Sequence, residues 1–218
     1  MSRTSKKAAA LSRKARIEEM RRAERARERR NRVITITLST LIVAGLAGWG
    51  VYALNSANEK DEQKAAAARK PVAGEKTWDK KKLTQNHVQG AVKYPMNPPV
   101  GGDHHQAWMT CDGTVFTKPI ANENAVHSLE HGAVWITYNH KAADADIKKL
   151  SDKVSRTPYT LMSPAGEQSG TIMLSAWGRQ LTVENASEPR IQQFLDKYVQ
   201  GPQTPEPGAA CTGGLTAT

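Results

Sequence analysis

Histidine is the residue type whose positions in this sequence most clearly indicate a chemical site. Four of the six histidines lie in two short segments: His104 and His105 in a glycine-rich stretch, and His127 and His131 in a run that reads His-Ser-Leu-Glu-His. Two histidines four residues apart on a helix project from the same face, so each can offer a nitrogen to one metal ion. Glu130 lies beside them and could orient a ring or act on a bound water.

The residues that follow His104 narrow the choice of metal. Met109 carries a thioether and Cys111 a thiol, and imidazole with such sulfur ligands suits copper or zinc rather than calcium or magnesium. The sequence therefore predicts a copper or zinc site in which Glu130 supports the ligands. The predicted ligands are His104, His127 and His131, with His105, Met109 and Cys111 as further candidates.

Two other interpretations of the histidines stay open at this stage. Each ring could instead bind a backbone carbonyl and hold the loop over a sheet, and the protein would then be a non-catalytic accessory or scaffold subunit of a membrane complex. The pattern at 127–131 also fits a zinc peptidase with two histidine ligands and a glutamate base. Gly132 would end such a helix at once, and the small domain leaves little room for a cleft, so we do not expect an enzyme.

The chain has two cysteines, Cys111 and Cys211, and both lie after the apolar segment described below. A disulfide between them would close a loop of about 100 residues and, in the chain-entropy model, stabilise the fold by up to about 4.7 kcal/mol. It would also fasten the Pro/Gly-rich C-terminal tail to the domain. The alternative leaves Cys111 as a free thiolate that can bind a soft metal.

The positive charge of the chain is concentrated at its N-terminus. Residues 1–32 carry nine of the ten units of net positive charge, and the rest of the chain is almost neutral. The charge is therefore confined to a tail instead of covering a folded face, and we do not expect nucleic acid to be a partner. Basic residues next to an apolar run are instead suited to contact with anionic membrane lipids.

An apolar run of 22 uncharged residues, 33–54, follows this tail. As a helix it would reach about 33 Å, enough to cross a bilayer. Arg29, Arg30 and Arg32 precede it, so the positive-inside rule predicts a cytoplasmic N-terminus and an extracytoplasmic C-terminal domain. The run is longer than the core of a cleaved signal peptide, so we expect an uncleaved single-pass anchor in the cell membrane.

The remaining segments must position the histidines. The sequence predicts a stalk at 55–77, a domain at 78–200 and a Pro/Gly-rich tail at 201–218. Within the domain it indicates a long ordered loop, helices and strands, which together give a small α+β fold with a short antiparallel sheet and two or three helices. The loop is 86–118; the helices are 123–131 with Asn122 as N-cap, 141–154, and a last helix capped by Ser187 with Pro189 in its first turn; the strands are 133–138, 159–162, 171–177 and 180–183.

The same segments carry a resemblance to a known family. The run Pro-Pro-Val-Gly-Gly-Asp-His at 98–104, then Trp108, then His-Ser-Leu-Glu-His-Gly at 127–132, resembles the signature of domain of unknown function family 3105, membrane-anchored bacterial proteins often met in actinobacteria. The resemblance covers about residues 78–200. Members usually carry Thr-Ser where this chain has Val100-Gly101, so any role of those hydroxyls is absent here. The family has no assigned reaction, so the resemblance implies a domain boundary and a set of residues.

Overall fold

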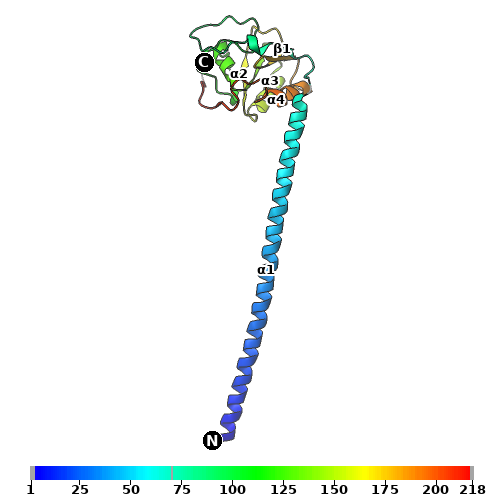
Figure 1. The fold of residues 1–218 in the computed structure, drawn as a ribbon, viewed down its shortest axis with the longest axis vertical. Helices are drawn as coiled ribbons and strands as arrows, with labels where there is room; N and C mark the ends of the chain where they lie inside the picture. Colours follow the sequence, from blue (N-terminus) through cyan, green and yellow to red (C-terminus); the bar gives the residue numbers. More distant parts are fainter. Residues whose placement is uncertain (1–2, 70, 217–218) are drawn as a thin grey trace. The chain divides into compact units, whose positions relative to one another are not determined.

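The N-terminal part of the chain is one continuous helix. The computed structural model describes residues 3–69 and 71–216, which form two compact units that divide between residues 60 and 61. Helix α1 (Arg3–Arg69) contains a segment, Met20–Ser56, that is long and apolar enough to span a membrane (Figure 1). The apolar side chains of this segment are exposed, and Trp49 reaches 70% exposure. Residues 33–54 of this segment carry no charge and therefore present a continuous apolar surface.

Three threonines in the predicted span satisfy their hydroxyl groups within α1. Thr35, Thr37 and Thr40 each donate a hydrogen bond of 2.8–2.9 Å to the carbonyl oxygen four residues earlier. Hydrocarbon contains no water to accept such a hydrogen bond, so this internal pairing removes the main cost of placing a hydroxyl there. The local structure of α1 therefore suits the membrane span that the sequence predicts.

The second unit is built on a six-stranded mixed sheet with the order β1-β6-β5-β3-β4-β2. Strands β1, β6, β5 and β3 pair antiparallel, whereas β3, β4 and β2 pair parallel. The strands are β1 (Lys76–Thr77), β2 (Asp112–Val115), β3 (Val134–Tyr138), β4 (Thr160–Pro164), β5 (Ile172–Ala176) and β6 (Arg179–Val183). The helices found with them in the described residues are α2 (Asn122–Glu130), α3 (Asp144–Val154), α4 (Pro189–Tyr198) and the short 3-10 helix η1 (Lys80–Lys82).

This architecture confirms the predicted α+β class, but the sheet differs from the one expected. It is larger than a short sheet, and two of its pairings are parallel. The β3–β4 pairing is parallel because α3 carries the chain back along the sheet between these two strands, as a crossover helix does. Sequence patterns do not reveal β2, because this short strand contains Gly113 and lies at the sheet's edge inside the glycine- and proline-rich region.

Each face of the sheet has its own apolar core. On one face Val134 of β3 packs with Leu150 of α3 and Phe194 of α4. On the other face the next residue of the same strand, Trp135, packs with Leu129 of α2. Successive side chains of a strand point to opposite faces, so β3 contributes to both cores. Helices α3 and α4 therefore cover one face, while α2 and the segments around it cover the other.

Two helix starts differ from the expected ones. Asn122 is the first residue of α2 and not its N-cap, and α4 is capped by Glu188 where Ser187 was expected. Pro189 occupies the first helical position, where its missing N–H costs nothing, so the cap must be the residue directly before it. Gly132 ends α2 as expected, with a φ of +90° that favours glycine.

Candidate metal centre

Three histidine rings meet where α2 faces the glycine-rich loop. His127 extends from α2, His104 from the loop, and His87 from a segment whose backbone forms a parallel bridge with His104. In this bridge the Val88 N–H donates to the His104 carbonyl oxygen at 2.8 Å. The ring centroids lie 5.0 Å apart for His87 and His104, and 4.9 Å apart for each of the other two pairs. The three imidazoles therefore form a nearly equilateral triangle.

Backbone carbonyls fix the orientation of the two buried rings. The Nδ1 atom of His104 lies 2.8 Å from the Gly102 oxygen, and that of His127 lies 2.8 Å from the His105 oxygen. A carbonyl oxygen can only accept a hydrogen bond, so each Nδ1 atom must carry the hydrogen. In the neutral rings the lone pair is then on Nε2. Metal-binding histidines commonly have this arrangement, in which the other ring nitrogen donates to a carbonyl.

Glu130 adds a buried carboxylate to the triangle. Its Oε2 lies 2.9 Å from Nε2 of His104, and the two side chains are 3% and 0% exposed. Within the described residues, however, His104 Nε2 makes no hydrogen bond of acceptable geometry, so the contact is an electrostatic attraction only when His104 is protonated. The ligand atoms of His87, His104, His127 and Glu130 all lie within 4.8 Å of one another. We name these four residues the inner cluster.

The two buried histidines of the inner cluster have opposite pKa shifts. Burial, helped by the neighbouring imidazoles, lowers the pKa of His127 to about 4, although the hydrogen bond to His105 opposes the shift. Burial would also lower the pKa of His104, but contact with the Glu130 carboxylate and the Gly102 carbonyl outweighs it, and that pKa is raised. His127 is therefore neutral at pH 7, as a ligand must be, whereas His104 keeps its proton to a higher pH than an ordinary histidine.

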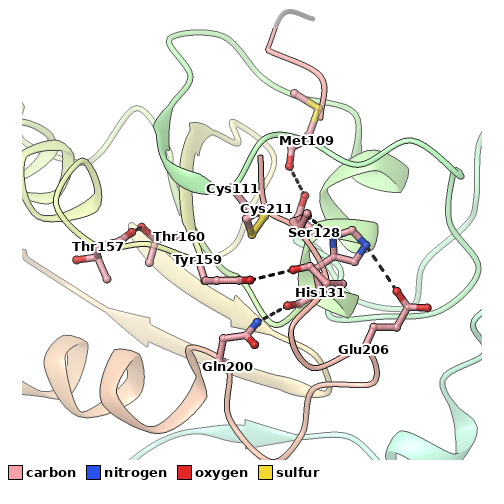
Figure 2. The surroundings of a disulfide bond; sticks show 12 residues. Met109, Cys111, Ser128, His131, Thr157, Tyr159, Thr160, Gln200, Glu206 and Cys211 are labelled. Atoms are coloured by element: carbon pink, nitrogen blue, oxygen red, sulfur yellow. Dashed lines mark hydrogen bonds and ion pairs between the residues drawn. A yellow bond between two sulfur atoms is a disulfide. The ribbon is translucent and has the colours of Figure 1, made fainter. Parts of the chain in front are cut away.

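A second group of ligand atoms shares His127. It consists of His127, His131 and Glu206, whose ligand atoms lie within 4.8 Å of one another, and we name it the outer group. The two rings are 4.6 Å apart. Nδ1 of His131 lies 2.8 Å from the Ala210 oxygen, and Nε2 lies 3.6 Å from Oε2 of Glu206 (Figure 2). His131 therefore repeats the arrangement of the two inner rings, with Nδ1 donating and Nε2 left for a ligand.

The C-terminal segment 201–216 is fastened beside these histidines. Cys211 forms a disulfide with Cys111, with a Cα–Cα distance of 4.8 Å (Figure 2). The Cys111 N–H also donates to the Cys211 oxygen at 2.9 Å, and the Tyr159 hydroxyl donates to the Ala209 oxygen at 2.9 Å. The disulfide fits the pairing that the sequence indicates and an oxidising compartment. The tail thereby supplies the carboxylate of the outer group.

The structure places the predicted ligands in two groups. His104 and His127 lie together in the inner cluster, whereas His131 lies with His127 in the outer group. Glu130, expected only to support the ligands, has its own carboxylate among the inner ligand atoms. The peptidase pattern at 127–131 is therefore divided between the two groups.

The remaining candidates have other contacts. Cys111 is in the disulfide and has no thiolate to offer. Met109 packs in the apolar core beneath α2 at 1% exposure. Nδ1 of His105 accepts a hydrogen bond of 3.0 Å from the Ala107 N–H, which engages a lone pair that a metal would need. The sulfur atoms that favoured copper or zinc over calcium and magnesium in the sequence are thus engaged elsewhere.

The sequence alone does not predict two residues of the site, His87 and Glu206. His87 is a single histidine in an irregular segment and becomes a neighbour of His104 only through the backbone bridge. Glu206 lies in the Pro/Gly-rich tail, which the disulfide and backbone hydrogen bonds hold beside His131. The one available signal was the pair of cysteines, since a Cys111–Cys211 bond implies that the tail returns to the histidine region.

The fold and the site define a class of protein: an α+β domain with a buried histidine and glutamate cluster, in a chain whose N-terminal helix could span a membrane. The chain belongs to the family described as "Protein of unknown function (DUF3105)", whose pattern matches residues 87–213, more than half of the chain. The match begins at His87 and includes both groups of ligand atoms. No curated protein and no solved structure matches the chain.

Proposed function

We propose that the C-terminal domain binds one divalent transition-metal ion at the inner cluster, with His87, His104, His127 and Glu130 as ligands. One observation carries the proposal. Two buried rings each use Nδ1 to donate to a backbone carbonyl, which leaves Nε2 as the ligand atom, and the ligand atoms of the four residues lie within 4.8 Å of one another. Such a gathering of ligand atoms around one small volume is what a metal site requires, and it is not needed to hold a loop.

The main rival is an accessory or scaffold protein whose histidines are structural. One observation favours it: the raised pKa of His104 means that a protonated His104 can pair with Glu130 in place of a metal. The carbonyl bonds of the three rings would serve this role as well. A purely structural role, however, leaves the buried Nε2 atom of His104 without a well-formed hydrogen bond to Glu130. Buried polar atoms without a hydrogen bond are uncommon and need an explanation.

The ligand set favours zinc or cupric copper. Three imidazole nitrogens and one carboxylate oxygen suit Zn²⁺ and Cu²⁺, whereas Cu⁺ prefers the thiolates and thioethers that this site lacks. Calcium and magnesium prefer shells made of oxygen ligands. The metal named by the proposal is therefore Zn²⁺ or Cu²⁺.

We further propose that the C-terminal domain lies outside the cytoplasm. Its supports are the basic residues 1–32 before the apolar part of α1 and the Cys111–Cys211 disulfide, which needs an oxidising environment. A reporter enzyme that is active only outside the cytoplasm, fused after Thr218, should be active. A reporter that is active only in the cytoplasm should be silent at the same position, and the reverse pattern would refute this orientation.

The test of metal binding uses the full chain purified in detergent, with metal analysis and thermal unfolding at pH 7. The wild type should hold one ion, and an excess of a hundred times Kd should stabilise it by about 2.7 kcal/mol. His127→Asn should abolish both effects and still fold, because the asparagine amide can replace Nδ1–H as donor to the His105 oxygen. His140→Asn, at an exposed histidine outside both groups, is the matched control and should behave as the wild type. A wild type that holds no ion and shows no stabilisation would favour the structural role.

A further inference from the structure

The two groups of ligand atoms share one side chain, and this sharing limits how they can be used. His127 belongs to the inner cluster with His104 and to the outer group with His131. Its ring centroid lies 4.9 Å from that of His104 and 4.6 Å from that of His131. His127 therefore lies between the two groups.

A neutral imidazole has one lone pair, so His127 can bind only one ion at a time. Its Nδ1 atom is committed to the His105 oxygen at 2.8 Å, which leaves Nε2 as the single ligand atom for either group. Two ions bridged by one deprotonated ring would require breaking that bond. The inner and outer positions are therefore alternatives for the same ion.

The outer group has the composition of a weaker and more accessible position. It offers two imidazoles and one carboxylate, against three imidazoles and one carboxylate inside. Its carboxylate, Glu206, is 53% exposed, whereas that of Glu130 is 3% exposed. An ion at the outer position would thus be held by fewer ligands and remain in contact with solvent or with a donor molecule.

The residues of the outer group are nevertheless held in place by contacts of their own. The backbone N–H of Glu206 donates to the backbone carbonyl oxygen of Glu130 at 3.1 Å, so the backbones of the two acidic residues are tied together. The His131 ring is turned by its bond to the Ala210 oxygen, one residue before the disulfide. The Trp108 ring flanks both histidines of the group, with centroid distances of 5.6 Å to His127 and 5.0 Å to His131. Both the ligand positions and their surroundings are therefore fixed.

We infer that the ion reaches and leaves the inner cluster through the outer group, with His127 passing it from His131 and Glu206 to His104, His87 and Glu130. This inference rests on the proposed metal function. The transfer exchanges ligands one at a time: Nε2 of His127 stays on the ion while the other ligands change. The domain is then an exchange module that takes Zn²⁺ or Cu²⁺ from a soluble chelate or a carrier and gives it up again by the same route. His87 is itself exposed and offers a competing direct route, which the experiment must separate.

The experiment follows Zn²⁺ moving between a fluorescent chelator and the full chain in detergent, by stopped flow, and gives uptake and release rates along with the Kd. The variants are Glu206→Gln and His131→Asn; the asparagine can keep the donor to the Ala210 oxygen while removing the Nε2 ligand. Each should slow uptake and release by the same factor, about tenfold for a transfer barrier raised by about 1.4 kcal/mol, so that the Kd is retained. Glu167→Gln, at an exposed glutamate outside both groups, should leave the uptake rate, the release rate and the Kd unchanged.

The outcomes separate this inference from the proposed function. Wild-type rates in both variants would mean that the ion enters beside His87, and the inference would be wrong although the metal site stands. A weakened Kd with unchanged uptake would make His131 or Glu206 a ligand of the resting site, which also contradicts the exchange route. Failure of the wild type to take Zn²⁺ from the chelator at any concentration would overturn the proposed function itself.

Discussion

The two faces of the sheet are built in different ways. The face under α3 and α4 is apolar and regular: Leu150, Phe194 and Leu174 meet there with almost no exposure. The face under α2 combines a short helix, a loop with few regular elements, a disulfide and a C-terminal tail, and it carries all the ligand atoms of both groups. Burial of apolar area alone can stabilise the first face, but the second needs specific cross-links between segments distant in the sequence.

The irregular face under α2 is held in a defined conformation by directional bonds, which is what a binding site there requires. The His104 ring donates to Gly102 within its own loop. His127 and His131 donate across segments, to the His105 carbonyl oxygen in that loop and to the Ala210 carbonyl oxygen in the C-terminal tail. The disulfide then fixes the tail. Such a region gains order from directional bonds, whereas the opposite face gains it from packing. Changes on the two faces should therefore have separable effects on stability and on metal binding.

The largest effect is expected from removing the disulfide. The double variant Cys111→Ala, Cys211→Ala opens a loop with a sequence separation of 100 residues. In the chain-entropy model the loss of stability is up to about 4.7 kcal/mol. Denaturant unfolding of the full chain would measure it. The same variant should lose the contribution of Glu206 to metal exchange, because the tail is no longer held. A variant with wild-type stability and exchange would show that the hydrogen bonds alone hold this face.

Truncating a side chain in the core under α3 and α4 should lower stability by a similar amount but leave metal binding unchanged. Phe194→Ala removes a fully buried ring from α4 and should cost about 3–5 kcal/mol. The affinity for Zn²⁺, measured by titration well below the melting temperature, should stay as in the wild type, because no ligand lies on that face. A parallel loss of affinity would mean that the two faces are not independent.

The smallest predicted effect is the pH dependence of stability without metal. An unfolded His127 takes up a proton near its ordinary pKa of 6.5, but the folded one does so only near 4. The unfolded state thus binds more protons in this window, and stability should fall as pH drops from 6.5 to about 4. The His104 pKa is raised, so its contribution is present below 6.5 and is lost as pH rises through the folded value.

These two windows do not overlap, so single variants can assign them. His127→Asn should reduce the loss of stability between pH 6.5 and about 4. His104→Asn should reduce the loss of stability above pH 6.5. Chemical denaturation at a series of pH values measures both. Identical pH profiles in the wild type and in both variants would contradict the electrostatics described for the cluster.

The sequence predicted the regular face better than the irregular one. The strand expected at 133–138 is Val134–Tyr138, and the helix expected at 141–154 is Asp144–Val154, because the periodicity of apolar residues sets both. For the site, helical spacing predicted that His127 and His131 lie together, and their rings are 4.6 Å apart at the C-terminal end of α2. The partnership of His87 with His104 could not be predicted, since it depends on the pairing of two irregular segments that have no periodic signal.

The most direct test of the central claim is a count of the histidines bound to the ion. Pulsed electron paramagnetic resonance on the full chain loaded with one equivalent of Cu²⁺ reports how many imidazoles coordinate the metal. The inner cluster predicts three in the wild type, one fewer in His87→Asn, and no change in His131→Asn. A count that stays the same in His87→Asn, or that falls in His131→Asn, would place the ion elsewhere and contradict the account.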